Sequence, residues 1–314
     1  MKQRILRAAL SLHCLLVASA PGRAHEGHSH DPAPAAADPR AVAPTLAHFY
    51  KARKGAPALT AGMTLDQAYQ VQDALVAILA RDFEARRTGA GQIAGYKAAL
   101  TNPAVQEKFG VKTPLRGVLL AGMLVPSGSE VDAAFGSNPL HEGDLLLRVR
   151  SGAINLAKTR SELLDALDAV IPFIELPDLV YARDVVVDGP ALAAADAGAR
   201  LGVVGSPIPL AAGQDWERRL AEFKLEILDE QGQVQATGFG QHLLGHPLDA
   251  ALWLRDAIVA SGRELKRGDV LSLGTVTRLV PVVAGTQVRA RYSGLDPRGP
   301  VEVLVKFVAR PVEP

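Results

Sequence analysis

The chain has 314 residues, of which 48% are hydrophobic and 21% are charged, and its formal net charge is +1. This composition is typical of a globular protein of one or two domains with a sizeable core. Because neither sign of charge dominates, nothing in it indicates nucleic acid or an anionic membrane surface as a partner.

The first 24 residues have the layout of a secretory signal peptide. A basic start, "MKQRILR", precedes the apolar run "AALSLHCLLVASA", and small residues follow at Gly22 and Ala24. The apolar run is shorter than the roughly 20 residues that span a bilayer, so we expect no stable membrane anchor. Cleavage after Ala24 would remove Cys14, the only cysteine. We therefore expect a periplasmic or secreted protein without disulfides.

Residues 25–44 are rich in Pro, Ala and His and show no apolar period, which predicts a flexible linker. His25, His28 and His30 could ligate a divalent metal ion, or they could belong to a solvated tail. A sequence of this composition holds no ligand in place, which favours the tail. The folded domain is expected to cover residues 45–314.

Three helices are expected from their capping residues. Thr64 and Gln67 form a Thr-x-x-Gln capping box ahead of an apolar helical repeat. Thr159 and Glu162 form a second box, and we expect Leu163, Leu164, Leu167 and Val170 on one face of that helix. His246 is placed to cap a third helix that begins at Pro247.

Strand patterns dominate after residue 200. The segment "FKLEILDEQGQVQATG" predicts a hairpin around Gln231 and Gly232, and "TQVRARYSG" and "VEVLVKFV" alternate with a period of two. Helices grouped before and between such strands indicate an α+β fold.

The stretch "HEGDLLLRVR" (141–150) places two acids at the start of an apolar strand pattern. Glu142 and Asp144 are two residues apart, so their side chains share one face of a strand. A third acid, Glu175, lies in the apolar segment "IPFIELPD". Like charges side by side repel unless a positive charge compensates them, and a hard cation such as Mg²⁺ or Mn²⁺ would do so. The alternative is an exposed turn for the pair and an arginine partner for Glu175.

Seven segments of the chain occur in one order that resembles a known family. They are "AGYKAALTN" (94–102), "RGVLLAGM" (116–123), "EGD" (142–144), "IPFIELPD" (171–178), "ATGFGQHLLGHPLDAALWL" (236–254), "GDVLSLGTVTRLVPV" (268–282) and "VRARYSGL" (288–295). Together they look like the 2-keto-4-pentenoate hydratase and 4-oxalocrotonate decarboxylase branch of the fumarylacetoacetate hydrolase superfamily. The resemblance implies a twisted mixed β-roll (91–314) with a helical N-terminal part (45–90).

The same resemblance implies roles for individual residues. It assigns the divalent metal, Mg²⁺ or Mn²⁺, to Glu142, Asp144 and Glu175. It also implies that Lys97 of "GYK" pairs with a substrate carboxylate or moves a proton, and that Thr277 holds substrate.

The chain also departs from the family pattern. Ala121 and Gly122 stand where the hydratases carry an aspartate pair, and "DAGA" (196–199) replaces "DNAS", keeping only Asp196. Asp196 is retained as an expected substrate contact. Arg278 replaces a glycine, and it would either contact a second anionic group of the substrate or form a salt bridge on the rim. The metal site thus looks kept, while part of the acid–base apparatus looks lost.

These features predict an exported lyase, a hydratase or decarboxylase that acts on a small 2-oxo acid. Two other functions stay open: a C–C bond hydrolase of the acylpyruvase type, and a non-catalytic small-molecule binding protein that kept the fold. The resemblance also implies a homo-oligomer.

Overall fold

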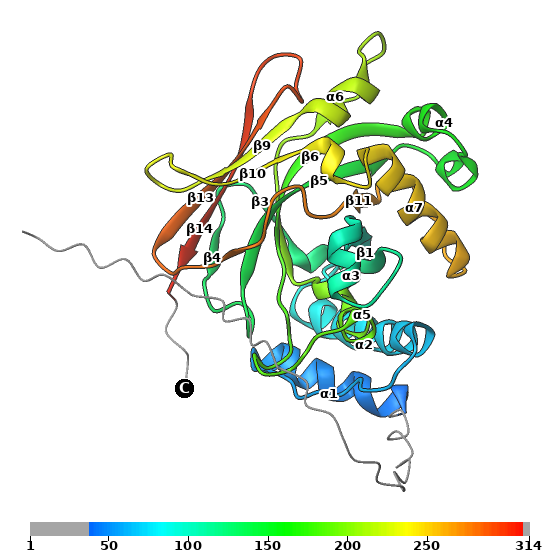
Figure 1. Cartoon of the computed structure of the whole chain (residues 1–314), viewed down its shortest axis with the longest axis vertical. Coiled ribbons are helices and arrows are strands. Elements are labelled where there is room, and N and C mark those ends of the chain that lie inside the picture. The colour runs from blue at the N-terminus through cyan, green and yellow to red at the C-terminus, as the bar shows by residue number, and fades with distance from the viewer. Residues whose placement is uncertain (1–37, 310–314) are drawn as a thin grey trace, which may run out of the picture. The chain divides into compact units, whose positions relative to one another are not determined.

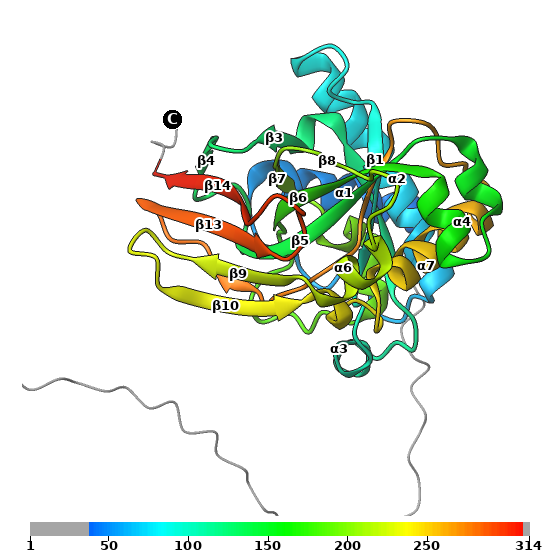
Figure 2. The same cartoon turned by 90° about the horizontal axis from the view of Figure 1, so that it is seen from above.

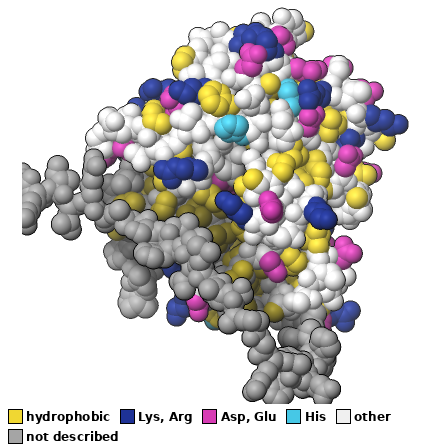
Figure 3. Space-filling model, in the orientation of Figure 1, with side chains coloured by type: hydrophobic (Ala, Val, Ile, Leu, Met, Phe, Trp, Pro, Cys, Tyr) yellow, Lys and Arg dark blue, Asp and Glu magenta, His cyan; other side chains and the backbone are white. Residues whose placement is uncertain are grey.

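The computed structural model describes residues 38–309 (Figure 1). The expected signal peptide and the three histidines at 25, 28 and 30 lie outside this range. Within residues 38–309 no helix is both long and apolar enough to cross a membrane. On the face drawn in Figure 3, basic and acidic side chains are interspersed without a continuous field of one sign.

The folded part begins earlier than the sequence suggested. Helix α1 starts at Pro39, because Asp38 accepts a hydrogen bond from the Arg40 amide and a proline fits the first helical position. Pro44, taken as the end of a linker, lies inside this helix. The predicted end of the linker at residue 44 is therefore wrong, because the chain is helical from Pro39 onward.

The helices vary from one to several turns. They are α1 (Pro39–Ala52), α2 (Leu65–Arg86), α3 (Pro103–Lys108), α4 (Arg160–Asp165), α5 (Gly189–Ala194), α6 (Trp216–Glu222) and α7 (Pro247–Ala260). Single 3₁₀ turns are η1 (Ala121–Met123), η2 (Gly152–Leu156), η3 (Asp196–Gly198) and η4 (Gly240–His242).

All three expected capping arrangements are confirmed. The capping boxes at Thr64 and Thr159 are formed, and the His246 side chain accepts from the Leu248 amide at the start of α7. The helix after Thr159 is shorter than expected, however. It ends at Asp165, and Leu167 and Val170 belong to the ten-residue strand β6 instead, which is mostly apolar and pairs on both sides.

One mixed sheet carries the residues that matter most for function. Its path runs β2 (Leu115–Leu120), β1 (Ile93–Ala99), β11 (Val270–Ser272), β5 (Leu140–Val149), β6 (Leu167–Leu176), β7 (Leu201–Val204) and β3 (Leu124–Pro126). Two short strands join it, β12 (Val280–Pro281) beside β5 and β8 (Ile208–Pro209) beside β6.

A second sheet has the order β10 (Val234–Phe239), β9 (Lys224–Leu228), β13 (Thr286–Ser293), β14 (Val301–Val308) and β4 (Glu130–Asp132). The expected hairpin is β9–β10. Figures 1 and 2 both show β5 and β6 between this sheet and α7. Strands β5 and β6 are covered on both faces as a result, and nearly all of their residues are buried.

Candidate active site

The two acids of the "EGD" segment lie side by side with the third acid across a strand pair. Glu142 and Asp144 are both on β5, and Glu142 stands directly opposite Glu175 of β6 in the register. All three side chains are buried. Like charges directly opposite one another destabilise a sheet, so this arrangement requires a compensating positive charge.

Lys97 of β1 supplies that charge in the structure. Its ammonium donates to Glu175 Oε1 and to the Ala197 carbonyl oxygen, the latter at 3.0 Å. Burial by itself would lower the pKa of Lys97, but the carboxylates of Glu175 and Glu142 outweigh burial and hold the pKa above its usual value. Lys97 is therefore a cation at neutral pH. Only 2% of its surface is exposed.

Burial and the neighbouring charge of Glu175 raise the pKa of Glu142 and of Asp144 well above the usual range of carboxylic acids. Asp144 is partly stabilised by hydrogen bonds from the Ser272 hydroxyl and from the Leu145 amide. The cluster has more potential negative charge than Lys97 alone neutralises, which is an environment that favours binding of an additional cation.

Two oxygens of the cluster are buried without a hydrogen-bond partner, Glu142 Oε2 and Glu175 Oε2. Buried polar atoms normally have a hydrogen-bond partner. A hard divalent cation would coordinate two carboxylate oxygens that lack one. Among residues 38–309, however, no three His, Cys, Asp or Glu side chains are already arranged as a metal site. Lys97 binds Glu175 and Ser272 binds Asp144, so two of the three acids already have a partner within the chain.

A cavity of about 610 Å³ opens onto this cluster. Four residues to which the family resemblance assigns catalytic, metal-binding or substrate-binding roles line it: Lys97, Glu142, Thr277 and Arg278. Asp144 and Glu175 lie behind this lining. The remaining wall is largely apolar, with Leu100, Val105, Phe109, Leu140, Leu179, Leu192, Val276 and Leu279. A mostly apolar cavity with a few convergent polar groups is typical of a small-molecule site.

Thr277 and Arg278 have different surroundings in this wall. The Thr277 hydroxyl is buried and accepts a hydrogen bond from the Gly143 amide at 3.0 Å, which ties it to the strand between the two acids. Arg278 is at the exposed rim and donates to the carbonyl oxygen of Gln235 at 2.7 Å. It makes no ion pair with a described acid, so the rim salt bridge considered from the sequence is not formed.

Asp196 is buried but does not line the cavity. Its Oδ1 accepts from the Val118 amide at 2.8 Å, and burial raises its pKa to about 8. The neighbours Ala197 and Gly198 form the cavity wall in its place. The expected substrate contact by Asp196 is therefore not what this structure shows; the residue supports the wall from behind.

Several cavity residues were not predicted from the sequence. They are His242 of η4, Thr237 of β10, and Asn102 and Lys108 at the two ends of α3. His242 Nδ1 lies 3.1 Å from the Val276 carbonyl oxygen and 3.5 Å from the Phe239 amide, so the ring is held against two backbone groups. Asn102, Thr237 and His242 lie in segments that carry the family resemblance, but their proximity arises from long-range folding and was not predicted from those segments.

Ala121 marks the position at which the hydratases carry the first of two aspartates. It begins the η1 turn after β2, and it is absent from the cavity lining. Lys97 faces Gly117 in the β1–β2 register, and β2 carries Ala121 further along, away from that point. The position at which the hydratases carry their aspartate pair therefore lies outside the wall of this cavity.

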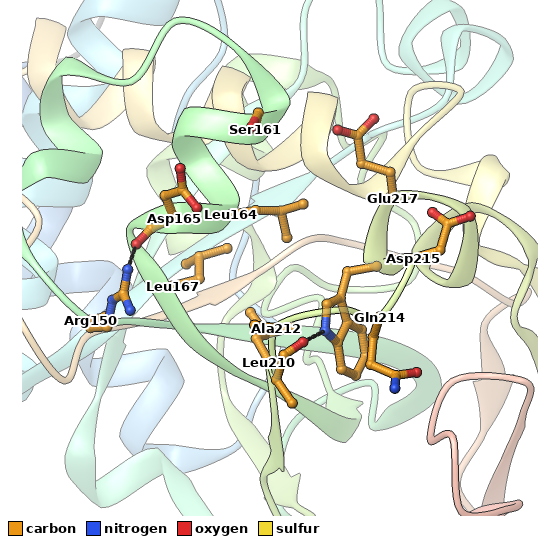
Figure 4. Close-up of a pocket in the computed structure, with 12 residues that line it drawn as sticks. Arg150, Ser161, Leu164, Asp165, Leu167, Leu210, Ala212, Gln214, Asp215 and Glu217 are labelled. Atoms are coloured by element: carbon orange, nitrogen blue, oxygen red, sulfur yellow. Dashed lines mark hydrogen bonds between the residues drawn. The ribbon is translucent and has the colours of Figure 1, made fainter.

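A second cavity, of about 500 Å³, lies between α4 and α6 (Figure 4). Arg150 donates to the carbonyl oxygen of Asp165, and Trp216 Nε1 donates to the carbonyl oxygen of Ala211 at 2.9 Å. None of the residues predicted to act in catalysis lines this cavity, and we assign the active site to the larger one.

Comparison with known proteins identifies the family of the chain. No protein-family model matches the chain. The 2-keto-4-pentenoate hydratase of Burkholderia vietnamiensis is 31% identical over 211 residues, which are 67% of this chain and 78% of the relative. The 2-keto-4-pentenoate hydratase 1 of Dechloromonas aromatica is 30% identical over 237 residues, 73% of this chain and 82% of the relative. A 4-oxalocrotonate decarboxylase of Pseudomonas sp. strain CF600 is 28% identical over 233 residues, 74% of this chain and 83% of the relative.

A solved structure gives the same result for the fold. The 4-oxalocrotonate decarboxylase of Pseudomonas putida G7, crystallised with magnesium and adipate, superposes with a TM-score of 0.73 at 25% identity, covering 86% of this chain and 97% of that one. The two sheets and their helices are thus the α+β fold of the fumarylacetoacetate hydrolase superfamily, as predicted. Within it, the chain belongs to the 2-keto-4-pentenoate hydratase and 4-oxalocrotonate decarboxylase family.

Proposed function

We propose that the protein is a divalent-metal-dependent lyase, a hydratase or decarboxylase, that acts on a small 2-oxo acid. One observation carries this proposal: Glu142, Asp144 and Glu175 form a buried acid cluster with two unsatisfied oxygens at a cavity that Lys97 also lines. The family's relatives named above are hydratases and decarboxylases of this substrate class.

The residues present fit a hard cation, Mg²⁺ or Mn²⁺. Glu142, Asp144 and Glu175 would hold it, because such ions take carboxylate oxygens and the two unpaired oxygens would gain a partner. A bound divalent ion would act as a Lewis acid that stabilises negative charge developing on the substrate oxygens. Related structures of the decarboxylase from Pseudomonas putida G7 hold magnesium or calcium, which supports this assignment.

The chain's own residues account for the rest of the proposed chemistry. Lys97, a cation that reaches the cavity floor, pairs with the substrate carboxylate or holds the proton that moves during the reaction. Thr277 fixes the wall beside Glu142 through the Gly143 amide. The apolar remainder of the wall excludes water and receives the hydrocarbon part of the substrate.

Metal addition to the metal-free protein tests the proposal. Mg²⁺ should raise the melting temperature, since a ligand that binds only the folded state stabilises it. Glu142→Gln should abolish this rise, whereas Glu130→Gln, at an exposed position on β4, should keep it. An equal rise in wild type and Glu142→Gln would place the metal elsewhere.

Turnover of a panel of 2-oxo acids, including 2-hydroxypenta-2,4-dienoate and 4-oxalocrotonate, then separates hydratase from decarboxylase. A protein that binds the panel with Mg²⁺ but turns over none of it would be a binding protein that kept the fold. Cleavage of acylpyruvates alone would identify a C–C bond hydrolase.

We also propose that the protein is exported and self-associates. The order of basic, apolar and small residues in 1–24 supports cleavage after Ala24, and the family resemblance supports an oligomer. N-terminal sequencing of protein from a periplasmic extract should begin at His25; a retained Met1 in a cytosolic fraction would refute export. Light scattering on the same sample gives the oligomer mass, and a monomer would refute self-association.

A further inference from the structure

A small cavity away from the active site is surrounded by positive charge. It measures about 200 Å³ and is lined by parts of α1, α2 and the start of β7. Four basic side chains line it, Lys51, Arg53, Arg86 and Arg200, against one acid, Asp82. It shares no lining residue with the active-site cavity.

Arg200 is the central group of this cavity, because it is buried and lacks an acid partner. Only 9% of its surface is exposed. Its guanidinium lies 3.7 Å from the centre of the Tyr50 ring, and Nη1 donates to the Tyr50 carbonyl oxygen at 2.7 Å. Among residues 38–309 it forms no salt bridge. A buried charge without an opposite charge beside it is costly, so an anion from solution would stabilise it.

The nearby acids are already engaged elsewhere. Asp178 and Asp196, whose charges reach Tyr50, accept hydrogen bonds from the amides of Asn138 and Val118. Within the cavity wall, Asp82 pairs with Lys51 at 3.0 Å. Neither Asp178, Asp196 nor Asp82 forms a salt bridge with Arg200 in the described part of the chain.

The other cations differ in how far they are available. Arg53 pairs with Asp132 at 2.6 Å and Lys51 with Asp82, so both are partly neutralised. Arg86 is exposed and makes no hydrogen bond or ion pair with a described residue. Arg86 and Arg200 together keep several N–H donors for a ligand. Two guanidinium groups facing one small cavity match the oxygens of a phosphate group, which accept paired N–H donors.

We propose that this cavity is a binding site for a phosphate group, with Arg200 and Arg86 as its main ligands. Its volume is below the roughly 300–1,000 Å³ of most organic-ligand pockets, which fits inorganic phosphate or the phosphate end of a small phosphomonoester. The proposal concerns binding and does not depend on the proposed lyase activity.

The chain connects this site to the active-site cavity by a short backbone path. Arg200 follows Ala197 and Gly198, which line that cavity, and the Ala197 carbonyl oxygen accepts from Lys97. Asp196 and Ala197 have φ angles of 55° and 51°, a left-handed conformation that non-glycine residues adopt at a cost. An anion that holds Arg200 would restrict this segment and thereby the position of Lys97.

Calorimetric titration of the full mature protein with potassium phosphate tests the site, against potassium chloride at matched ionic strength. We expect binding of phosphate and none of chloride. Arg86→Gln should weaken phosphate binding about tenfold, the loss of one charged contact. Arg267→Gln, which removes an exposed arginine without a described partner, should not change it. Arg200→Gln should abolish binding; should that variant fail to fold, Arg86→Gln decides alone.

Two results would overturn the proposal: no phosphate binding by the wild type, or equal weakening by Arg86→Gln and Arg267→Gln, which would indicate general charge attraction. Titration with glycerol phosphate distinguishes the source of the group. Tighter binding than inorganic phosphate would indicate a phosphomonoester ligand, and weaker binding would indicate the free ion; either supports the site.

Discussion

The Lys97 ammonium binds the Glu175 carboxylate although β1 and β6 are not neighbours in the sheet. Strands β11 and β5 lie between them, so a flat sheet would hold the two backbones three strand spacings of about 4.8 Å apart. Both side chains are nearly fully buried, with 3% and 2% exposed. The contact therefore shows that the sheet curls around the acid cluster, and it places the Lys97 ammonium on a carboxylate that a metal ion would also bind.

This pairing predicts the behaviour of Lys97→Met. Turnover of an accepted 2-oxo acid should fall by about 100-fold or more, the usual scale for a positioned acid–base group. The metal-free protein should melt at a lower temperature, because the buried carboxylates lose their only cation. The rise in melting temperature on adding Mg²⁺ should then exceed that of the wild type, since the ion no longer displaces an ammonium from Glu175.

The matched control for this variant is Lys112→Met, at an exposed lysine without a described partner. It should resemble the wild type in turnover and in both melting temperatures. A Lys97→Met protein whose response to Mg²⁺ is smaller than that of the wild type would contradict competition between lysine and metal.

Tyr292 of β13 connects the second sheet by hydrogen bonds to β5 and β6, the strands that carry the acids. Its hydroxyl is fully buried, accepts from the Phe173 amide at 2.9 Å and lies 2.6 Å from the Asp144 carbonyl oxygen, to which it can donate. Tyr292→Phe leaves these groups unpaired and should lower the free energy of unfolding by about 1–3 kcal/mol in urea titrations. Tyr96→Phe, whose hydroxyl bonds no described residue, should cost much less. Equal costs would mean that the bridge does not stabilise the strands.

Local features of the fold could be predicted from the sequence because they depend on nearby residues. The boxes at Thr64 and Thr159 join residues three apart, and the shared face of Glu142 and Asp144 follows from the period of a strand. The end of α4 was misjudged, because Leu167 fits the apolar period of a helix and is drawn into β6 only by its strand partners.

Long-range features of the site could not be predicted in this way. The opposition of Glu142 and Glu175 depends on a register between two strands, and the Lys97 contact depends on curling of the sheet. The family resemblance identified these three residues, but only the fold shows that Lys97 already binds one of the acids. His242 lies in a segment that carries the family resemblance but was given no role there, and its place in the cavity follows from the η4 turn.

Arg278 offers a test of substrate class. At the rim it is held by the Gln235 carbonyl oxygen and has no described acid partner, so it is available to a second anionic group. Arg278→Gln should raise the KM for dicarboxylic 2-oxo acids about tenfold, with little change for monocarboxylic ones. Initial rates on matched pairs of substrates measure this, with Arg267→Gln as the control. An equal rise in KM for both classes of substrate would mean that Arg278 only stabilises β10, through its hydrogen bond to Gln235.

The buried Asp196 gives a pH dependence whose sign can be worked out. Burial raises its pKa from 3.8 to about 8, so between these values the folded protein keeps a proton that the unfolded chain has released. The unfolded state therefore binds fewer protons, and this residue's contribution to stability falls as pH rises from about 4 to about 8, then levels off.

Asp196→Asn keeps an oxygen for the Val118 amide and cannot ionise. Its free energy of unfolding relative to wild type should therefore increase with pH through that window and become constant above pH of about 8. Urea titrations of metal-free protein at several pH values measure the difference. Asp184→Asn, at an exposed aspartate without a described partner, should show no such trend. A difference for Asp196→Asn that is the same at every pH would mean that this carboxyl is not protonated in the fold.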